Sequence, residues 1–320
     1  MGGNDNRLEY EKRVNRVIDY IRAHLGEPLS LASLAVVAAF SPFHFHRVFT
    51  AMTGETLFGF IQRLRIERAA TALHLHRDRS VLAVAIDHGF SSAATFARAF
   101  RGHFGMTATE WREGGAERWR SRRESKPGKH LSNARKAPGG RRGNTPRQRR
   151  GARTAARGEA RVSVQVQMKD VPTQHVAYMR YVGPYGPHGI PELWERFGRW
   201  MAGRDLRMAD TVRLGIAYDD PSVTAAEKLR YDACVVVPPD FSADRWVNLM
   251  DVPGGRFAVA PFVGTARDIT RVWDSVFSTW LPRSGFQPDD RLCFELYRGN
   301  PFVDGKDTFQ CDLYLPIRPL

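Results

Sequence analysis

Two arginines, Arg47 and Arg98, occupy equivalent positions in two copies of an internal repeat. A planar guanidinium can bond bidentately to O6 and N7 of guanine, so one such arginine per repeat is a pattern suited to reading base edges in duplex DNA. The copies share Ser41, Phe45, Arg47, Phe49, Gly54 and Thr56, which recur as Ser92, Phe96, Arg98, Phe100, Gly105 and Thr107. The alternative for each arginine is a solvated surface charge, but their equivalent positions in the repeat favour two equivalent DNA-contacting units.

Metal chemistry is not expected from the histidines and cysteines. His44 and His46 stand two residues apart on a predicted helix, so they point to different faces and cannot chelate one ion. The three cysteines are widely spaced and form no C-x-x-C pair, which argues against a zinc site and a disulfide framework. There is also no Ser/His/Asp set and no phosphate loop, so no catalytic residue, cofactor or metal is assigned.

A single acid, Glu295, interrupts an apolar run between Phe294 and Leu296. An internal alignment of the C-terminal half matches Tyr218 with Tyr297, which places Glu295 against the apolar Ile216 of the sister strand. A desolvated carboxylate among aromatic rings selects cations by charge and by cation–π contact. The alternatives are a structural salt bridge or an exposed strand residue for Glu295, and plain core for the rings. The candidate ligand-binding residues are Glu295, Tyr185, Trp194, Tyr218 and Trp273.

The arginine repeat lies in a half of the chain whose apolar residues recur at helical spacing. Ser30, Ser41, Ser80 and Ser92 precede the blocks as N-caps, and Gly54, Gly89 and Gly105 stand where helices should stop. Each copy of the repeat reads as helix, tight turn, helix, so residues 1–113 are predicted to form an all-α domain with two helix-turn-helix units. The helical blocks are residues 8–25, 31–38, 43–52, 56–76, 81–88, 93–104 and 107–113.

Charge is concentrated in the middle of the chain. Of a net charge of +14, residues 114–161 supply almost all, with 16 Lys and Arg against 3 Asp and Glu. This segment has almost no large apolar residues, so residues 114–160 are predicted to be a basic disordered linker. It is either a solvated spacer or a source of phosphate contacts that add affinity without reading sequence.

Glu295 lies in a third segment, residues 161–320, where the pattern changes to period two. Predicted strands cover residues 162–168, 175–181, 233–237, 257–263, 292–297 and 309–315, with helices near 192–201 and 269–281. Asp170-Val171-Pro172 returns as Asp251-Val252-Pro253, so this α+β domain is expected to contain two pseudo-symmetric β-α-β-β halves. Two such halves normally meet over a cleft, where small ligands bind.

The N-terminal half resembles the AraC family of regulators from about residue 8 to residue 112. The resemblance rests on LASLA at 31–35, SPFHFHRVF at 41–49 and IDHGFSS at 86–92. It departs at Ala108, where many relatives have proline. The resemblance implies that two recognition helices, joined by a long helix over residues 56–76, enter successive major-groove segments. It places Phe43, His46 and Arg47 in one groove segment and Ala94, Thr95 and Arg98 in the next.

The C-terminal half resembles the GyrI-like domains, over about residues 162–318. The resemblance rests on YVGPY at 181–185, GIAYDDP at 215–221, KLRYD at 228–232, VPGG at 252–255, FELY at 294–297 and LPI at 315–317. Gly264-Thr265-Ala266 departs from a second Gly-Pro-Tyr, so that side of the pocket is expected to differ in shape. The resemblance implies an effector-binding domain in which Glu295 receives cationic ligands.

These features together predict a DNA-binding transcriptional regulator with a C-terminal effector domain, and not an enzyme. Double-stranded DNA and a small-molecule effector are the expected partners, with RNA polymerase as a further candidate. The longest apolar stretch, near residues 31–40, is too short to span a bilayer, so no membrane partner and a cytoplasmic location are expected. Two alternatives stay open: a hydrolase that uses Glu295 with Tyr185, and a protein-interaction module without a ligand.

Overall fold

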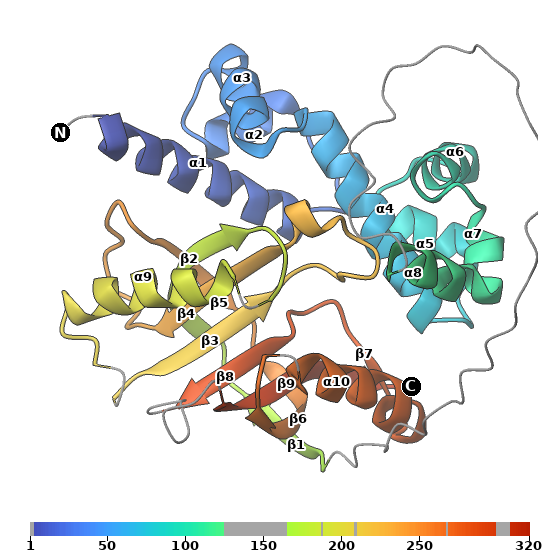
Figure 1. The fold of residues 1–320 in the computed structure, drawn as a ribbon. Coiled ribbons are helices and arrows are strands. Elements are labelled where there is room, and N and C mark those ends of the chain that lie inside the picture. Colours follow the sequence, from blue (N-terminus) through green and yellow to red (C-terminus); the bar gives the residue numbers. More distant parts are fainter. Residues whose placement is uncertain (1–2, 125–164, 187, 208–209, 267, 299–307) are drawn as a thin grey trace, which may run out of the picture.

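A computed structural model describes residues 3–124, 165–186, 188–207, 210–266, 268–298 and 308–320. A helical N-terminal region lies against a C-terminal region built on a curved sheet, and the sheet carries its own helices (Figure 1). The predicted combination of an all-α domain with an α+β domain is confirmed.

The N-terminal helices begin and end where side-chain caps place their limits. Ser30, Ser41, Ser80 and Ser92 each accept a bond from a backbone N–H of the first turn. Gly54 and Gly105 stop the third and sixth helices with φ of 70°, a left-handed conformation that favours glycine. The helices are α1 (Gly3–Ala23), α2 (Leu31–Val37), α3 (Pro42–Thr53), α4 (Leu57–Leu75), α5 (Val81–Asp87), α6 (Ala93–Phe104) and α7 (Ala108–Glu110).

None of the helices in the described ranges is by itself long and apolar enough to cross a membrane. Helices α2 and α3 meet the length and composition only as a pair, and a bend of 78° separates them.

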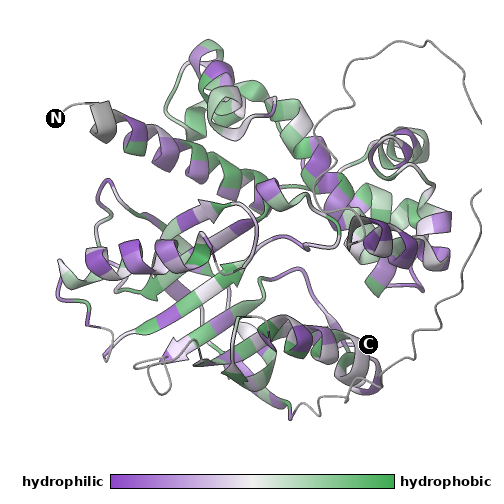
Figure 2. Cartoon of the chain, viewed as in Figure 1, coloured by the Kyte–Doolittle hydropathy of each residue, from purple (hydrophilic) through white to green (hydrophobic). Residues whose placement is uncertain are grey.

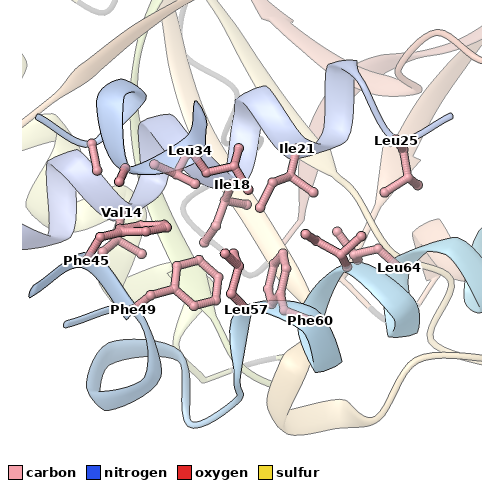
Figure 3. Close-up of a cluster of buried hydrophobic side chains, with 14 residues drawn as sticks. Val14, Ile18, Ile21, Leu25, Leu34, Phe45, Phe49, Leu57, Phe60 and Leu64 are labelled. Atoms are coloured by element: carbon pink, nitrogen blue, oxygen red, sulfur yellow. The ribbon is translucent and has the colours of Figure 1, made fainter. Parts of the chain in front are cut away.

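The repeated phenylalanines build two separate cores. Phe45 and Phe49 of α3 pack with Phe60 of α4 and with the buried face of α1 (Figure 3). Phe96 and Phe100 of α6 form the second core with the C-terminal half of α4. Helix α4 therefore contributes to both units and sets the spacing between α3 and α6.

The N-terminal domain extends beyond its predicted limit at Glu113, and the linker prediction needs correction there. After α7 the chain continues as a π-helical turn (Trp111–Gly115) and helix α8 (Ala116–Glu124). Trp119 packs on Phe104 with ring centroids 5.2 Å apart, so apolar contact with the second core orders this stretch. Residues 125–160 of the predicted linker lie outside the described residues.

The C-terminal sheet shows the predicted internal symmetry, although each half has one strand more at its start than the predicted β-α-β-β order. Its order is β1-β6-β9-β8-β3-β4-β2-β5, which reads the same when the two halves are exchanged, and β7 pairs with β9 off this path. Each half begins with a short strand that pairs with the other half: β1 with β6, and β5 with β2. The strands are β1 (Gln167–Val171), β2 (Gln174–Val182), β3 (Val212–Ala217), β4 (Arg230–Val236), β5 (Asn248–Val252), β6 (Gly255–Gly264), β7 (Phe286–Pro288), β8 (Phe294–Arg298) and β9 (Phe309–Pro319).

Two helical segments cover one face of this sheet. Helix α9 (Ile190–Ala202) packs on the first half, and α10 (Asp268–Ser275), continued by a π-helical turn (Val276–Trp280) and a 3-10 turn (Leu281–Arg283), packs on the second. Hydrophilic and hydrophobic residues alternate along α9, as expected for a helix with one buried side (Figure 2). Trp194 of α9 contacts the cores of both halves, so it stands near the middle of this face.

The opposite face of the sheet receives α1 of the N-terminal domain. Arg180 of β2 donates to Asp19 of α1 at 2.8 Å and to Asp232 of β4 at 2.7 and 2.8 Å, and Tyr178 also donates to Asp19. The Arg180 and Asp232 side chains are 2% and 0% exposed. A buried ion network therefore joins the two domains.

Candidate nucleic-acid interface and ligand pocket

Three predicted DNA-contacting residues share the exposed side of α3. Phe43 is 66% exposed, although it stands in a helix whose Phe45 and Phe49 are buried. His46 and Arg47 are exposed as well, and the Arg47 guanidinium lies 5.7 Å from the centroid of the Phe43 ring. The structure thus brings together a forked donor and an apolar ring, groups that suit guanine and the thymine methyl respectively.

Helix α6 presents the equivalent side with a different chemistry. Ala94 and Arg98 are exposed, while Thr95 is half-buried. The Thr95 hydroxyl donates to the Ser92 carbonyl at 2.8 Å and accepts from the Ser92 N–H at 3.2 Å in a capping box. Because the cap engages this hydroxyl, Thr95 presents mainly its methyl group on the exposed side of α6, and Arg98 is the predicted residue there whose polar group is not engaged by the cap.

The connector α4 is braced by the C-terminal domain. Arg63 of α4 bonds Glu55 at 2.7 Å and Glu67 at 3.0 Å. From the loop between β3 and β4, Lys228 reaches Glu55 at 2.8 Å and the Thr224 hydroxyl donates to Glu67 at 2.9 Å. Burial would raise the pKa of Glu55, but bonds from Arg63 and Lys228 hold it below its ordinary value. The C-terminal domain therefore contacts the helix that spaces the two recognition helices.

The second candidate site is centred on Glu295 of β8, on the helix-covered face of the sheet. The Tyr297 hydroxyl donates to Oε2 of Glu295 at 2.7 Å and the Tyr231 hydroxyl at 3.2 Å. The Trp273 side chain also hydrogen-bonds this carboxyl, and part of Glu295 stays accessible. Burial raises the pKa of Glu295, and the phenol and indole donors offset the rise in part. None of the ion pairs within the described ranges includes Glu295, so its charge has only neutral donors.

Gly215 of β3 makes room for this arrangement. It is paired directly with Glu295 across the strands, and a Cβ there would lie 2.1 Å from the Tyr231 hydroxyl and 2.9 Å from Oε2 of Glu295. Gly215, Tyr231 and Tyr297 were not predicted as site residues. The two-residue spacing of Glu295 and Tyr297 was an available signal, because alternate residues of a strand share a face.

Three of the predicted aromatic residues lie on the face that carries Glu295. Trp194 donates from its indole to the Tyr231 hydroxyl at 3.2 Å and packs on Tyr297 at 5.5 Å between ring centroids. Trp273 contacts the carboxyl directly. The Tyr185 ring lies 6.4 Å from that of Tyr231, but its hydroxyl donates to the Arg230 carbonyl at 2.6 Å. Tyr185 therefore neighbours the group without bonding Glu295, and the geometry does not form the Glu295–Tyr185 pair of the hydrolase alternative.

Tyr218 is not brought together with Glu295. Its hydroxyl donates to Oδ2 of Asp232 at 2.7 Å on the opposite face, where α1 docks. The internal alignment of Tyr218 with Tyr297 is corrected accordingly: Glu295 pairs with Gly215, and Ile216 points to the other face. A register error of one residue exchanges the two faces of a strand, which explains the misplacement.

Comparisons with known proteins match the two regions separately. Residues 34–114 match a family model described as a helix-turn-helix domain, and residues 164–318 match one described as a GyrI-like small molecule binding domain. A putative transcriptional regulator of a Bacillus subtilis prophage is 34% identical over 155 residues, which is 48% of this chain and 100% of the relative. A DNA gyrase inhibitor of Serratia proteamaculans is 30% identical over 48% of this chain and 97% of the relative.

Solved structures also resemble the N-terminal region. A transcriptional regulator with an AraC-type DNA-binding domain from Chromobacterium violaceum is 26% identical, with a TM-score of 0.32 over 33% of this chain and 95% of that chain.

Proposed function

Because the chain belongs to the AraC-type regulators that carry a C-terminal GyrI-like domain, we propose that it reads an asymmetric DNA site and binds an organic cation at Glu295. The observation that carries the ligand part is a partly accessible carboxyl whose hydrogen-bond donors are all neutral. A regulator of this kind acts on the chromosome, so we place it in the cytoplasm.

DNA reading is assigned to the exposed sides of α3 and α6. Arg47 and Arg98 are exposed at equivalent positions, and both helices are attached to α4. Two such helices on one chain read two successive major-groove segments, so no second chain is needed. The expected site is asymmetric and about 15 to 20 base pairs long.

Selection of bound fragments from a random DNA pool by the full chain tests this assignment. One asymmetric site should be recovered, and Arg47→Ala or Arg98→Ala should cost about 1 to 3 kcal/mol at that site while hardly changing binding to unrelated DNA. Arg199→Ala, on the exposed side of α9, is the matched control. Recovery of a palindrome that requires two chains, or equal weakening on all sequences, would contradict the assignment.

The ligand part of the proposal rests on the charge balance around Glu295. A carboxylate bonded only by hydroxyl and indole donors lacks the cation that a buried acid normally requires. Aromatic rings from Trp194, Tyr231 and Trp273 lie beside it and can contact a cation through their π faces. An organic cation with aromatic groups would supply the missing charge.

Strand β4 offers a physical link from the Glu295 site to the DNA-binding domain. Tyr231 points to Glu295, and the next residue, Asp232, points to Arg180 and through it to Asp19 of α1. A shift of β4 on ligand binding would act on both faces, because neighbouring residues of a strand are rigidly connected. We propose that this link makes DNA affinity depend on the ligand.

The affinity of the full chain for its selected DNA site, measured with and without tetraphenylphosphonium, tests the regulation. We expect a change in DNA affinity in the wild type and a smaller change in Asp19→Asn, which removes the ion pair between the domains. If the cation bound without any effect on DNA affinity, the proposed coupling through β4 would be rejected, whereas the proposed cation site at Glu295 would stand. Conversion of a cationic ester to products would favour the hydrolase alternative.

A further inference from the structure

A cavity of about 530 Å³ lies between the two domains. Its N-terminal wall is formed by Arg22 and Ala23 of α1 and Arg68 of α4, and its C-terminal wall includes Pro253 and Leu292. Pockets that hold small molecules have volumes of about 300 to 1,000 Å³. None of the residues that surround Glu295 lines this cavity, so it is a separate space.

The two arginines on the N-terminal wall lack an anionic partner among the described residues. Nε of Arg22 is buried without a hydrogen-bond partner, and the guanidinium lies 5.3 Å from the centroid of the Tyr218 ring. Burial, together with the nearby charges of Arg22 and Arg230, lowers the pKa of Arg68 to about 10, although the charges of Asp219 and Asp290 oppose this shift. Two partly desolvated cations that repel each other leave a site that favours an anion.

Two of the carboxylates in the wall already have side-chain partners. Asp289 accepts from Nε of Arg291 at 3.0 Å, and Asp251 lies 2.7 Å from Nδ1 of His175. Asp290 is exposed and forms none of the hydrogen bonds or ion pairs identified in the described ranges, although its charge acts on Arg68. Asp290 is therefore the acid that would compete with an incoming anion.

We infer that this cavity is a binding site for a small multivalent anion, such as a phosphate ester or a polycarboxylate, held by Arg22 and Arg68. The forked donors of two guanidiniums match the oxygens of phosphate and carboxylate groups. Because the arginines belong to the DNA-binding domain and the opposite wall to the effector domain, the bound anion would stabilise the arrangement of the domains seen here.

Calorimetry on the full chain with inorganic phosphate and with citrate, at constant ionic strength, tests the site. Arg22→Gln and Arg68→Gln should each weaken binding by about tenfold or more, since each removes a charged hydrogen-bonding partner. Arg16→Gln, an exposed arginine also on α1, is the matched control and should leave the affinity unchanged. Arg47→Gln reports on anions held at the DNA-contacting face instead.

The Asp290→Asn variant should change anion affinity in the opposite direction, and it keeps both arginines. Removal of the competing charge should strengthen phosphate and citrate binding severalfold, so this variant tests the site even if Arg68→Gln fails to fold. Weaker binding in Asp290→Asn would show that Asp290 is the partner of Arg68 and would overturn the inference. The inference would also be overturned if neither phosphate nor citrate bound the wild type. The same holds if Arg47→Gln abolished anion binding while Arg22→Gln retained it.

Discussion

Asp232 and Glu295 are two acids on opposite faces of one sheet, and their hydrogen-bond partners differ in charge. Asp232 has a bidentate guanidinium partner, Arg180, and a further donor in Tyr218. Glu295 has the hydroxyls of Tyr231 and Tyr297 and the Trp273 indole, but no cation among the described residues. Both carboxyls have several hydrogen-bond partners, so the difference between them is charge. The first acid completes a contact between the domains, and the second is the acid at which we propose that a cation binds.

The largest expected effect comes from removing the cation of the first acid. Arg180→Met should lower the free energy of unfolding by about 3 to 5 kcal/mol, because it leaves Asp232 buried without its partner and Asp19 without its ion pair. Urea unfolding of the full chain measures this loss. Arg199→Met, in an exposed pair with Glu195, should change stability by less than about 0.5 kcal/mol. A loss of under about 1 kcal/mol in Arg180→Met would mean that the network contributes little.

The second acid should matter for binding more than for stability. Glu295→Gln keeps the shape and removes the charge, so binding of tetraphenylphosphonium should weaken by about 1 to 3 kcal/mol in calorimetry. Neutral triphenylphosphine oxide should bind both forms alike, and Glu195→Gln on α9 serves as the control acid. Equal affinity of wild type and Glu295→Gln for the cation would return Glu295 to a structural role.

The pH dependence of folding stability should reveal Glu295 without any ligand. Burial raises the pKa of Glu295 above its value in the unfolded chain, so the folded state binds the proton more tightly. Protonated Glu295 therefore stabilises the folded state at pH values below 4.5, the pKa of the carboxyl in the unfolded chain. This stabilisation is lost as the pH rises through the higher pKa of Glu295 in the folded chain. Urea unfolding between about pH 4 and 7 should show the wild type losing stability relative to Glu295→Gln with rising pH. Parallel profiles would contradict an elevated pKa.

The smallest effect is expected at Tyr218. Tyr218→Phe removes one hydrogen bond to Asp232 and should cost about 1 kcal/mol of stability, because Arg180 still neutralises the acid. Affinity for tetraphenylphosphonium should stay the same, whereas Tyr297→Phe should change it, since that hydroxyl bonds Glu295. A Tyr218→Phe variant with reduced cation affinity would mean that Tyr218 takes part in ligand binding, as the sequence predicted.

Predictions for the helical half agreed closely with the structure. Helices α3 and α6 are amphipathic, and a serine N-cap and a left-handed glycine mark their ends, so the helical period and both limits of these helices are set by the local sequence. The sheet was harder to predict. Strands β3, β5 and β7 were missed: Gly215 interrupts the apolar run of β3, β5 is only five residues long with a mixed pattern, and β7 has only three residues. A buried central strand carries little alternation, because both of its faces are covered.

The sequence alone determined which residues repeat, where the helices end, and that Arg47, Arg98 and Glu295 are unusual in their local setting. These features depend on the spacing of residues within a single helix or strand, and this spacing can be recognised directly in the sequence. The three-dimensional packing was needed to show that Gly215, rather than Ile216, pairs with Glu295, that Tyr218 bonds Asp232, and that Arg22 and Arg68 line the same cavity. Register between strands and docking between domains depend on partners distant in sequence, so no local pattern specifies them.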